Sequence, residues 1–403
     1  MSPARRRLAA LALLAGSLLV SVGAGEVALR LAGYTSLHAV YSKPELFWRH
    51  DDLLGWSLEP NARGRYTGPR PHPIEFDSAI ETNALGLRGP ELAPRASGEL
   101  RLLFLGDSFT AGFEVEQPET FTALLERHLG RRLRVPVSVV NAAVRGYGTD
   151  QSYLWFRERG RALGADLVVA VFSANDFEDN VTFHRPRRPF GKPAFALRPN
   201  GALELVGVPV PRYEACSAWV LGPGYRPVRV DGWLARGACE FQMRLADRSA
   251  LFSLVAMSAA RLPGLVGFLN RIWQPAAAGA AHASLVPWPL APHRADVGPG
   301  VGAGGERARL ERELTTALLQ ALAREVRASG AGFLLLMIPQ HFGRVDLRAL
   351  RADQIEPRSV ALRGAVDPAQ IRFRNDSHLN RLGHRLYAEG LLPIVEAELR
   401  ARR

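Results

Sequence analysis

A serine stands directly after a short apolar run, at a point where a nucleophile would be open to a bound substrate. Residues 102–105 read Leu-Leu-Phe-Leu, and Gly106, Asp107 and Ser108 follow them. Ligands of parallel α/β sheets bind outside the carboxyl ends of the strands, so a serine hydroxyl at this point would meet a substrate there. Gly-Asp-Ser is also an ordinary turn sequence. Ser108 is therefore a candidate nucleophile for acyl transfer only if the chain also supplies its partners.

An acid and a base for this serine stand near the end of the chain, at Asp376 and His378. A serine hydroxyl needs a general base to take its proton, and a carboxylate orients the imidazole and stabilises its charged form. In an extended segment, residues i and i+2 project to the same side. We therefore expect Asp376 to reach one ring nitrogen of His378 while the other faces Ser108. The alternative is a surface histidine that caps the last helix.

Two further histidines compete with His378 for the role of base. A helix is predicted to begin near Asn380, which puts His384 at least a turn along it, where it would pack or face solvent. His341 follows an apolar run and is expected at the same sheet edge as Ser108. Neither has a carboxylate beside it in the sequence. His378 and His384 are six residues apart, the wrong spacing for two metal ligands on one helical face, so no metal site is expected.

Donors for an oxyanion are available after two other apolar runs, at Gly146 and Asn175. The backbone N–H groups of Ser108 and Gly146 and the side-chain amide of Asn175 would hold the charge that develops on an ester carbonyl oxygen. Each such donor is worth roughly 3 kcal/mol in acyl-transfer chemistry. Glycine at 146 lets the backbone approach a substrate without an intervening Cβ. Taken singly, Gly146 could be a turn glycine and Asn175 a cap residue.

The elements that must bring these groups together alternate between strand and helix. Buried strands are predicted at 102–105, 135–141, 167–172 and 333–338, because these runs are continuously apolar. Helices are predicted at 120–129 with Gly130 as the stop, from a cap at Thr149 or Asp150 to 163 with Gly164 as the stop, at 306–329, and at 380–400. This alternation predicts an α/β sheet with right-handed crossovers. The candidate serine, glycine and asparagine all follow strands, so they should meet at one edge of it.

Four short blocks carry a resemblance to a known family. They are 106–108 (Gly-Asp-Ser), 141–146 (Asn-Ala-Ala-Val-Arg-Gly), 173–176 (Ser-Ala-Asn-Asp) and 376–380 (Asp-Ser-His-Leu-Asn). In this order they resemble the SGNH (GDSL-type) esterases, over roughly residues 100–180 and 306–400. The resemblance implies a flavodoxin-like three-layer α/β/α domain with a mainly parallel sheet, and ester chemistry through an acyl-serine without a cofactor.

One spacing departs from that family. Its acid commonly precedes the histidine by three residues, where this chain has Asn375. An amide cannot compensate the charge of an imidazolium. The shorter Asp-x-His spacing of Asp376 and His378 is similar to that of some relatives, exported polysaccharide acetyltransferases among them.

The N-terminus is typical of export. Arg5, Arg6 and Arg7 precede an uncharged stretch from Leu8 to Ala24 that is rich in Leu, Ala and Val. A basic flank before an apolar run leaves the basic end in the cytoplasm. The run spans roughly 25 Å as a helix, short for a membrane span and long for a signal core. We expect an exported, periplasmic or extracytoplasmic protein anchored by residues 8–24, with secretion after cleavage near Ala24 as the alternative.

The chain divides into three parts by composition. Residues 1–34 form the signal or anchor, 35–98 an N-terminal extension rich in Pro, Gly and Arg, and 99–403 the catalytic domain with a large irregular insertion at about 181–304. A helix is expected within 249–268 of that insertion. The insertion also holds both cysteines, Cys216 and Cys239, and an oxidising compartment would allow them to pair.

Composition excludes some classes of protein. With 403 residues, 47% of them hydrophobic, the chain can bury a sizeable core. The net charge of +12 is dispersed, and no recognition helix, zinc finger or RNA-binding signature accompanies it, so a nucleic-acid partner is not expected. The oligomeric state is not indicated.

Three functions fit these residues. The first is an exported serine esterase that removes short acyl groups from a small-molecule, carbohydrate or cell-envelope ester. The second is an O-acyltransferase of an envelope polysaccharide, in which a sugar hydroxyl takes the acyl group in place of water. The third is a catalytically silent glycan-binding module that uses the same pocket.

Overall fold

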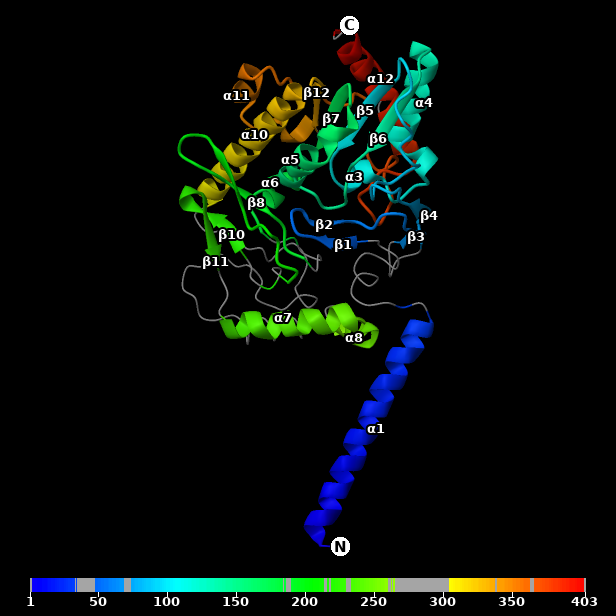
Figure 1. The fold of residues 1–403 in the computed structure, drawn as a ribbon, viewed down its shortest axis with the longest axis vertical. Helices are drawn as coiled ribbons and strands as arrows, with labels where there is room; N and C mark the ends of the chain where they lie inside the picture. The colour runs from blue at the N-terminus through cyan, green and yellow to red at the C-terminus, as the bar shows by residue number, and fades with distance from the viewer. Residues whose placement is uncertain are drawn as a thin grey trace.

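Four parallel strands form the central sheet of the computed structural model. They are β5 (Leu100–Leu105), β6 (Val137–Asn141), β7 (Leu167–Phe172) and β12 (Gly332–Met337). The strand order is β12-β7-β5-β6 (Figure 1). Strand β5, which comes first along the chain, therefore lies inside the sheet, between β6 and β7. In the register, Leu103 of β5 pairs with Val140 of β6 and Val168 of β7. This parallel α/β sheet confirms the predicted fold class.

Helices cover both faces of the sheet, which explains why its strands are apolar throughout. Helices α4 (Phe121–Leu133) and α12 (Arg381–Ala401) pack on the face that presents Leu102 and Phe104. Helices α5 (Thr149–Glu158) and α10 (Gly304–Ala328) pack on the opposite face, which presents Leu103 and Leu105. Successive strand residues point to opposite faces, so a strand buried on both sides needs an apolar residue at every position.

The structure describes residues 2–32, 34, 48–68, 74–183, 185, 190–213, 216, 219–229, 233–259, 262, 264, 304–337, 339–362 and 366–401. Within them, two predicted helix ends are wrong. Helix α4 continues past Gly130 to Leu133, which packs on the core, and Arg134 closes it in the left-handed conformation. Helix α5 ends at Glu158 instead of 163, and a 3₁₀ turn, η2 (Gly160–Leu163), carries the chain on to Gly164.

The N-terminal extension forms two antiparallel hairpins that pack on the catalytic domain. They are β1 (Trp48–Asp51) with β2 (Gly55–Leu58), and β3 (Arg63–Gly68) with β4 (Phe76–Glu81). Trp56 and Tyr66 of these hairpins are buried in the same core as Leu103. The extension therefore forms one continuous core with the sheet domain.

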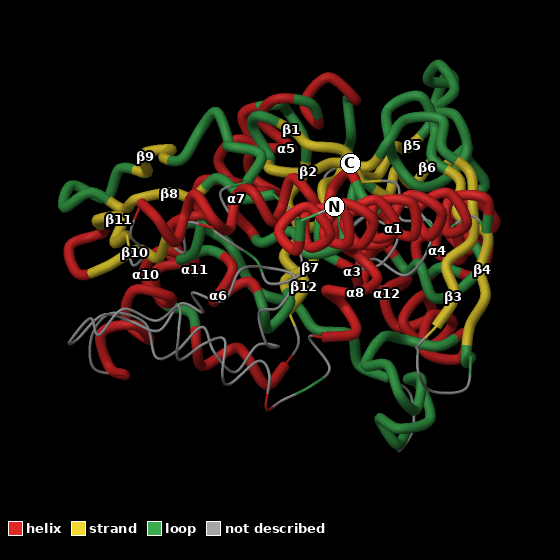
Figure 2. The backbone as a smooth tube through the Cα atoms, turned by 90° about the horizontal axis from the view of Figure 1, so that it is seen from below, coloured by secondary structure: helices red, strands yellow, loops and turns green. Residues whose placement is uncertain are grey.

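The insertion contains more regular structure than its composition indicates. It holds the hairpins β8 (Ala194–Leu197) with β9 (Leu203–Val206) and β10 (Trp219–Gly222) with β11 (Arg226–Arg229), the turn η4 (Pro223–Tyr225), and helices α7 (Trp233–Arg248) and α8 (Ala250–Ala259). Figure 2 shows hairpins β3–β4 and β8–β9 at opposite ends of the body. A disulfide joins Cys216 to Cys239 of α7. The predicted helix within 249–268 corresponds to α8, and α7 was not foreseen.

Four short elements complete the catalytic domain: α3 (Ser108–Ala111), η1 (Gln117–Glu119), α6 (Asp176–Asp179) and, after β12, η5 (Pro339–Arg344). A further helix, α11 (Leu347–Ala352), precedes the segment that leads to α12.

Helix α1 (Pro3–Leu31) projects from the body (Figure 1), and none of its residues is buried. Among the described residues it is the one helix long and apolar enough to cross a membrane. A signal sequence near an N-terminus has the same properties.

Candidate active site

The turn after β5 presents Ser108 at the first position of α3. The Asp107 side chain accepts a hydrogen bond from the backbone N–H of Phe109, at 3.0 Å, and so caps this short helix. Gly106 has a φ of 154°, and a Cβ there would lie 2.8 Å from the Thr110 hydroxyl and 3.1 Å from the carbonyl oxygen of Val171. The tight turn therefore requires glycine before Asp107. Backbone N–H groups in the first turn of a helix have no partner within the helix, so that of Ser108 is available to a ligand.

His378 lies between Ser108 and Asp376. Its Nε2 is 2.8 Å from the Ser108 hydroxyl, and its Nδ1 is hydrogen-bonded to Oδ1 of Asp376. The same carboxylate oxygen accepts the backbone N–H of His378, at 2.9 Å. Asp376 therefore holds the imidazole through two bonds. The structure brings together the three residues that the sequence proposed as nucleophile, base and acid.

A second carboxylate, Glu114, also lies beside the imidazole. Its Oε1 is 3.3 Å from Nδ1 of His378, and its side chain is fully buried. The same oxygen accepts a hydrogen bond from Arg145, at 2.5 Å. The Arg145 guanidinium lies over the ring of Tyr66, at 4.9 Å from its centroid. Burial lowers the pKa of Arg145 and the Glu114 carboxylate raises it, with a net upward shift. One Glu114 oxygen thus lies between the Arg145 guanidinium, which compensates its charge, and the His378 imidazole.

Arg88 of the N-terminal extension supports the loop that carries Glu114. Its buried guanidinium donates to the carbonyl oxygens of Ala111, at 3.0 Å, of Val115, at 2.6 Å, and of Gly112. Burial lowers the pKa of Arg88 to about 10. Because the chain leaves α3 at Ala111, these three bonds fix the path of the backbone from the nucleophile to Glu114.

The loop after β6 is held against the nucleophile turn. The Val144 N–H donates to the Gly106 carbonyl at 3.1 Å, which continues the β5–β6 ladder beyond the strands. Trp56 donates its indole N–H to the Arg145 carbonyl, at 3.2 Å, and Arg185 donates to the Gly146 carbonyl, also at 3.2 Å. With a φ of 84°, Gly146 adopts a conformation that favours glycine.

Asn175 stands at the end of β7, just before α6. Its side-chain amide donates one hydrogen bond to Asp179, at 2.9 Å, and Asp179 is also paired with Arg185. A primary amide has two N–H groups, so one donor remains for a ligand. The next residue, Asp176, is buried and accepts a hydrogen bond from Thr149, at 2.8 Å. Burial and then the nearby Asp107 raise its pKa well above its usual value.

A buried ion pair lies beneath this part of the site. Lys192 bonds to Asp150, and both side chains are fully buried. The Lys192 ammonium also donates to the carbonyl oxygens of Asp179, at 2.8 Å, and Pro193, at 2.9 Å. Burial raises the pKa of Asp150 and the charge of Lys192 lowers it, with a net upward shift. One cation thus joins the insertion to the first residues of α5 and the end of α6.

The remaining candidates lie elsewhere. His384 is buried within α12, where its Nδ1 accepts the backbone N–H of Phe121 at 3.1 Å, and burial lowers its pKa to about 3. His341 lies in η5, and no hydrogen bond among the described residues joins it to Ser108. Asn375 donates two hydrogen bonds of 3.0 Å to Glu75, one from its backbone and one from its amide. Asn375 is therefore turned to the N-terminal extension.

The family model of the GDSL-like lipases and acylhydrolases matches residues 104–386, well over half of the chain. This chain belongs to the GDSL-like lipase/acylhydrolase family. As a member of that family, it is a hydrolase of ester bonds. No curated protein matches the sequence.

Several solved structures are similar to this acylhydrolase in part. They include TesA (14% identity, TM-score 0.35, 74% of this chain and 98% of that one), the esterase EstA from Pseudoalteromonas sp. (11%, 0.36, 74% and 98%) and the acetylxylan esterase Axe2 from Geobacillus stearothermophilus (12%, 0.33, 73% and 93%). We draw nothing further from them, because the TM-scores are below 0.5.

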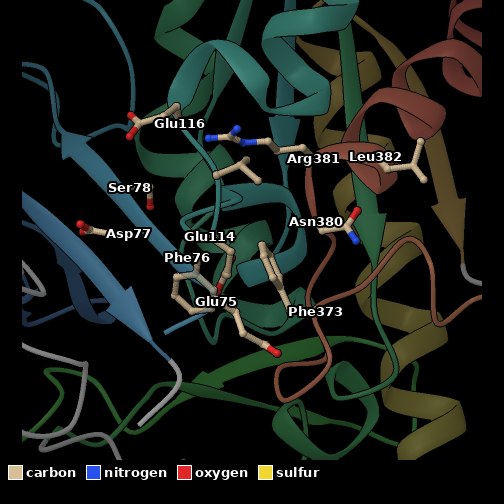
Figure 3. A pocket seen from close by; sticks show the side chains of 11 residues that line it. Glu75, Phe76, Asp77, Ser78, Glu114, Glu116, Phe373, Asn380, Arg381 and Leu382 are labelled. Atoms are coloured by element: carbon tan, nitrogen blue, oxygen red, sulfur yellow. The ribbon is translucent and has the colours of Figure 1, made fainter. Parts of the chain in front are cut away.

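A pocket of about 450 Å³ lies beside Glu114 in this GDSL-like protein (Figure 3). One wall is formed by Glu75 and by Phe76, the first residue of β4, and the segment before α12 forms the other with Phe373. The Phe76 and Phe373 rings meet edge to face, with centroids 5.1 Å apart. Glu114 also lines this pocket, whereas Ser108 does not.

Glu114, Asp376 and His378 are also the one group within the described part of the chain whose spacing suits a metal ion. Both carboxylates already have partners, because Asp376 bonds to His378 and Glu114 bonds to Arg145. The imidazole and both carboxylates of this acylhydrolase are therefore already engaged with one another and with Arg145.

Sequence reasoning missed three charged residues of the site: Arg88, Glu114 and Arg145. No local signal marked Glu114 as buried. Glu114 and Glu116 alternate with Phe113 and Val115, which is the pattern of a half-exposed segment. The partner of Glu114 could not be found from spacing either, because Arg145 lies in another block of the sequence.

Proposed function

We propose that this acylhydrolase is an exported serine esterase that removes short acyl groups from a carbohydrate or other cell-envelope ester through an acyl-serine intermediate. The observation that carries the proposal is the hydrogen-bonded chain from Ser108 through His378 to Asp376. A nucleophile, a base and a carboxylate in this geometry are the parts that acyl transfer to serine requires.

The first half of the reaction acylates the serine. The Ser108 oxygen attacks the ester carbonyl as Nε2 of His378 takes the hydroxyl proton. The carbonyl oxygen becomes an oxyanion, which accepts hydrogen bonds from the N–H groups of Ser108 and Gly146 and from the free amide N–H of Asn175. The C–O bond to the alcohol then breaks, and the leaving oxygen takes the proton from His378.

The second half returns the enzyme to its starting state. Water attacks the acyl-serine as His378 takes one of its protons, and the same donors hold the second oxyanion. The bond from the acyl carbon to Ser108 breaks, and the serine oxygen regains the proton from His378. Asp376 carries the negative charge that stabilises the imidazolium at both stages, and Glu114 adds a second negative charge 3.3 Å from the same nitrogen.

A small apolar pocket supports a short acyl group. It has a volume of about 50 Å³ and is lined by Phe109, which follows the nucleophile, and by residues at the ends of β7 and β12, among them Phe172, Ser173 and Met337. This volume is far below the roughly 300–1,000 Å³ of pockets for larger ligands, so it favours a short acyl group over a long one.

The N-terminal segment supports an extracytoplasmic location. Helix α1 is apolar, and the three arginines at 5–7 lie at its outer end. A basic N-terminal flank stays in the cytoplasm, so the catalytic domain would lie on the opposite side of the membrane. In that compartment the disulfide between Cys216 and Cys239 is stable.

Transfer to an acceptor is the second candidate. The Asp376–His378 spacing of two residues and the helix that would anchor the domain both favour an O-acyltransferase of an envelope polysaccharide. The same acyl-serine would then react with a sugar hydroxyl instead of water. Product analysis with and without an oligosaccharide acceptor separates the two, because only a transferase forms a new ester.

The test of the esterase is turnover of p-nitrophenyl acetate by the full chain in detergent, beside Ser108→Ala and His378→Ala. We expect activity in the unmodified protein and none above background in the two variants. Ser377→Ala and His341→Ala are the matched controls, since neither side chain is part of the proposed machinery, and both should keep full activity. A folded protein with no turnover of acetyl to octanoyl esters, and no labelling of Ser108 by a fluorophosphonate, would contradict the proposal.

A further inference from the structure

Helix α7 has two apolar faces, and one of them is unpartnered among the described residues. Cys239, Met243 and Ala246 are buried in a small cluster with Cys216, against which Tyr213 and Phe252 of α8 pack. On the opposite side of the helix, Phe241 is 67% exposed and Leu234 is 66% exposed. Leu245 continues this outer face, and Trp233, at the start of the helix, is 78% exposed. A helix that only covered the core would carry polar residues on its outer side.

Exposed arginines accompany these apolar side chains. Arg244 and Arg248 are exposed, three and seven residues after Phe241, so they lie on the same side of α7. Aromatic and aliphatic side chains mixed with arginine are typical of a helix that lies in the interface between lipid tails and headgroups. Helix α8 extends the exposed apolar surface with Leu254 and Val255.

Helix α8 is joined to α1 at the end of the apolar segment. Glu26 of α1 accepts hydrogen bonds from the hydroxyl of Ser249, at 2.8 Å, and from the backbone N–H groups of Ala250, at 3.1 Å, and Leu251, at 3.0 Å. These are the first N–H groups of α8, so a residue of α1 supplies its cap. The two helices therefore meet at a defined point.

Two further contacts fix this junction. Arg30 donates to the carbonyl oxygen of Arg248, the last residue of α7, at 2.6 Å. Gly25 of α1 faces the Leu251 side chain of α8, which would lie 3.4 Å from a Cβ at position 25, so the two helices are in van der Waals contact here. The α7–α8 unit is thus attached to α1 within a turn or two of the point where the uncharged stretch ends.

The length of α1 places this junction at a membrane surface. Residues 8–25 carry no charge and, at 1.5 Å per residue, extend about 27 Å, close to the thickness of about 30 Å of a bilayer core. Figure 1 shows α1 extending away from the body and α7 lying crosswise at the level of its upper end, on the side of the body nearest to α1. With its inner face packed on Cys216 and Tyr213, α7 presents its outer face toward the level at which α1 would enter the lipid.

We propose that the outer face of α7–α8, formed by Trp233, Leu234, Phe241, Leu245 and Val255, lies in the surface of a phospholipid bilayer. This inference rests on the proposal that α1 spans the membrane. The insertion then holds the catalytic domain against the bilayer in one orientation, instead of leaving it on a flexible tether. In Figure 1, α3 and α6, which follow strands β5 and β7, lie on the side of the sheet that faces β1–β2 and α7, so the catalytic edge faces the membrane side.

Spin labels test the depth of this face in the full chain. Both native cysteines are in the disulfide, so an introduced cysteine is the one free thiol to label. Phe241→Cys and Leu245→Cys report on α7, Leu14→Cys on α1, and Ala397→Cys on the exposed side of α12, near the C-terminus and far from α1 in Figure 1. Each labelled protein is reconstituted in vesicles of three parts phosphatidylcholine to one part phosphatidylglycerol. Collisions with oxygen, which enters lipid, are compared with collisions with a water-soluble nickel chelate.

We expect the labels at 241 and 245 to collide severalfold more with oxygen than with the chelate, as the label at 14 does, and the label at 397 to show the reverse. Labels at 241 and 245 that the chelate reaches as freely as it reaches 397 would overturn the proposal. Labels that neither reagent reaches would overturn it too, because protein would then cover the face. If the chelate reaches position 14, α1 does not span the bilayer and the inference falls with it. Esterase turnover of the same samples is a separate measurement, so the proposed reaction is tested independently.

Discussion

Removal of the Asp376 carboxylate, the proposed acid of the site, should cost less activity in this protein than the loss of such a group usually does. In Ser-His-Asp sites, replacing the aspartate by asparagine lowers kcat by about 10⁴, because the imidazole loses its correct tautomer and its counter-charge. Here Glu114 lies 3.3 Å from the same ring nitrogen that Asp376 binds. In Asp376→Asn, a small rotation of the imidazole would let Glu114 accept the Nδ1–H.

The expected loss of activity depends on how well Glu114 replaces Asp376 as the partner of the imidazole. If Glu114 recovers about half of the lost stabilisation, Asp376→Asn costs about 10², which is about 3 kcal/mol at 1.36 kcal/mol per decade. We expect Glu114→Gln alone to cost about tenfold, since Asp376 still holds the ring and only a charge beyond direct hydrogen-bond distance is lost. The double variant should reach about 10⁴, because no carboxylate then faces the imidazole. The loss of activity in the double variant is therefore larger than the product of the two single losses, which is about 10³.

The assay is kcat/KM for p-nitrophenyl acetate with the four proteins of this double-mutant cycle. Thermal unfolding is measured in parallel, since Glu114→Gln removes the carboxylate that is hydrogen-bonded to the buried Arg145 guanidinium. The comparison is made only at temperatures where all four proteins are folded. Glu178→Gln, which changes an exposed carboxylate on α6, is the matched control and should leave kcat/KM unchanged. If Asp376→Asn alone is as inactive as the double variant, Glu114 does not act on the imidazole and the reasoning is refuted.

Three other predictions concern stability. Lys192→Met leaves Asp150 buried without its cation and should lower the free energy of unfolding by about 3–5 kcal/mol in urea titrations. Lys192→Met combined with Asp150→Leu should recover most of this loss. Equal losses in the single and the double variant would contradict the ion-pair account. Burial lowers the pKa of His384 to about 3 from an ordinary value of 6.5, so the unfolded chain binds the proton first as the pH falls. The free energy of unfolding should therefore fall between about pH 6.5 and pH 3, by at most about 1.36 kcal/mol per pH unit. An unchanged dependence of stability on pH in this range in His384→Phe would argue against this. Reduction of the disulfide between Cys216 and Cys239, which are 23 residues apart, should lower the free energy of chemical unfolding by about 3 kcal/mol. The reduced but folded protein should keep its esterase turnover. Loss of turnover with folding intact would show that the insertion acts on the site.

Local patterns predicted the elements of the catalytic domain well. Strand β7 begins and ends at the predicted residues, and the other three strands lie within two residues of theirs, because a strand buried on both faces must be apolar at every position. The helix ends were predicted less well. Gly130 was expected to stop α4, yet the packing of Leu133 on the core outweighs the roughly 1 kcal/mol that a glycine costs inside a helix.

The insertion shows the limit of local patterns. Helix α7 was not foreseen, because its sequence carries apolar residues on two sides and contains Gly237. Its inner face is defined by contacts with Cys216 and Tyr213, which precede it in an irregular segment. A helix is recognised from its sequence by one apolar face and one polar face, so a helix with two apolar faces lacks the pattern that predicts it.

By itself, the sequence determined the parallel α/β sheet and the order of the residues that follow its strands. Apolar strands and turn residues are local in the chain, so Ser108, Gly146 and Asn175 could be assigned to one sheet edge from their positions alone. The pairing of Asp376 with His378 was also a local matter, because residues two apart in an extended segment share a side. Only the tertiary structure decided which charges surround that pair. Glu114 meets Arg145 and His378 through the folding of separate loops, and Arg88 of the N-terminal extension binds the backbone of the loop that carries Glu114. A buried charge needs a partner in space, and no spacing in the sequence records which residue that is.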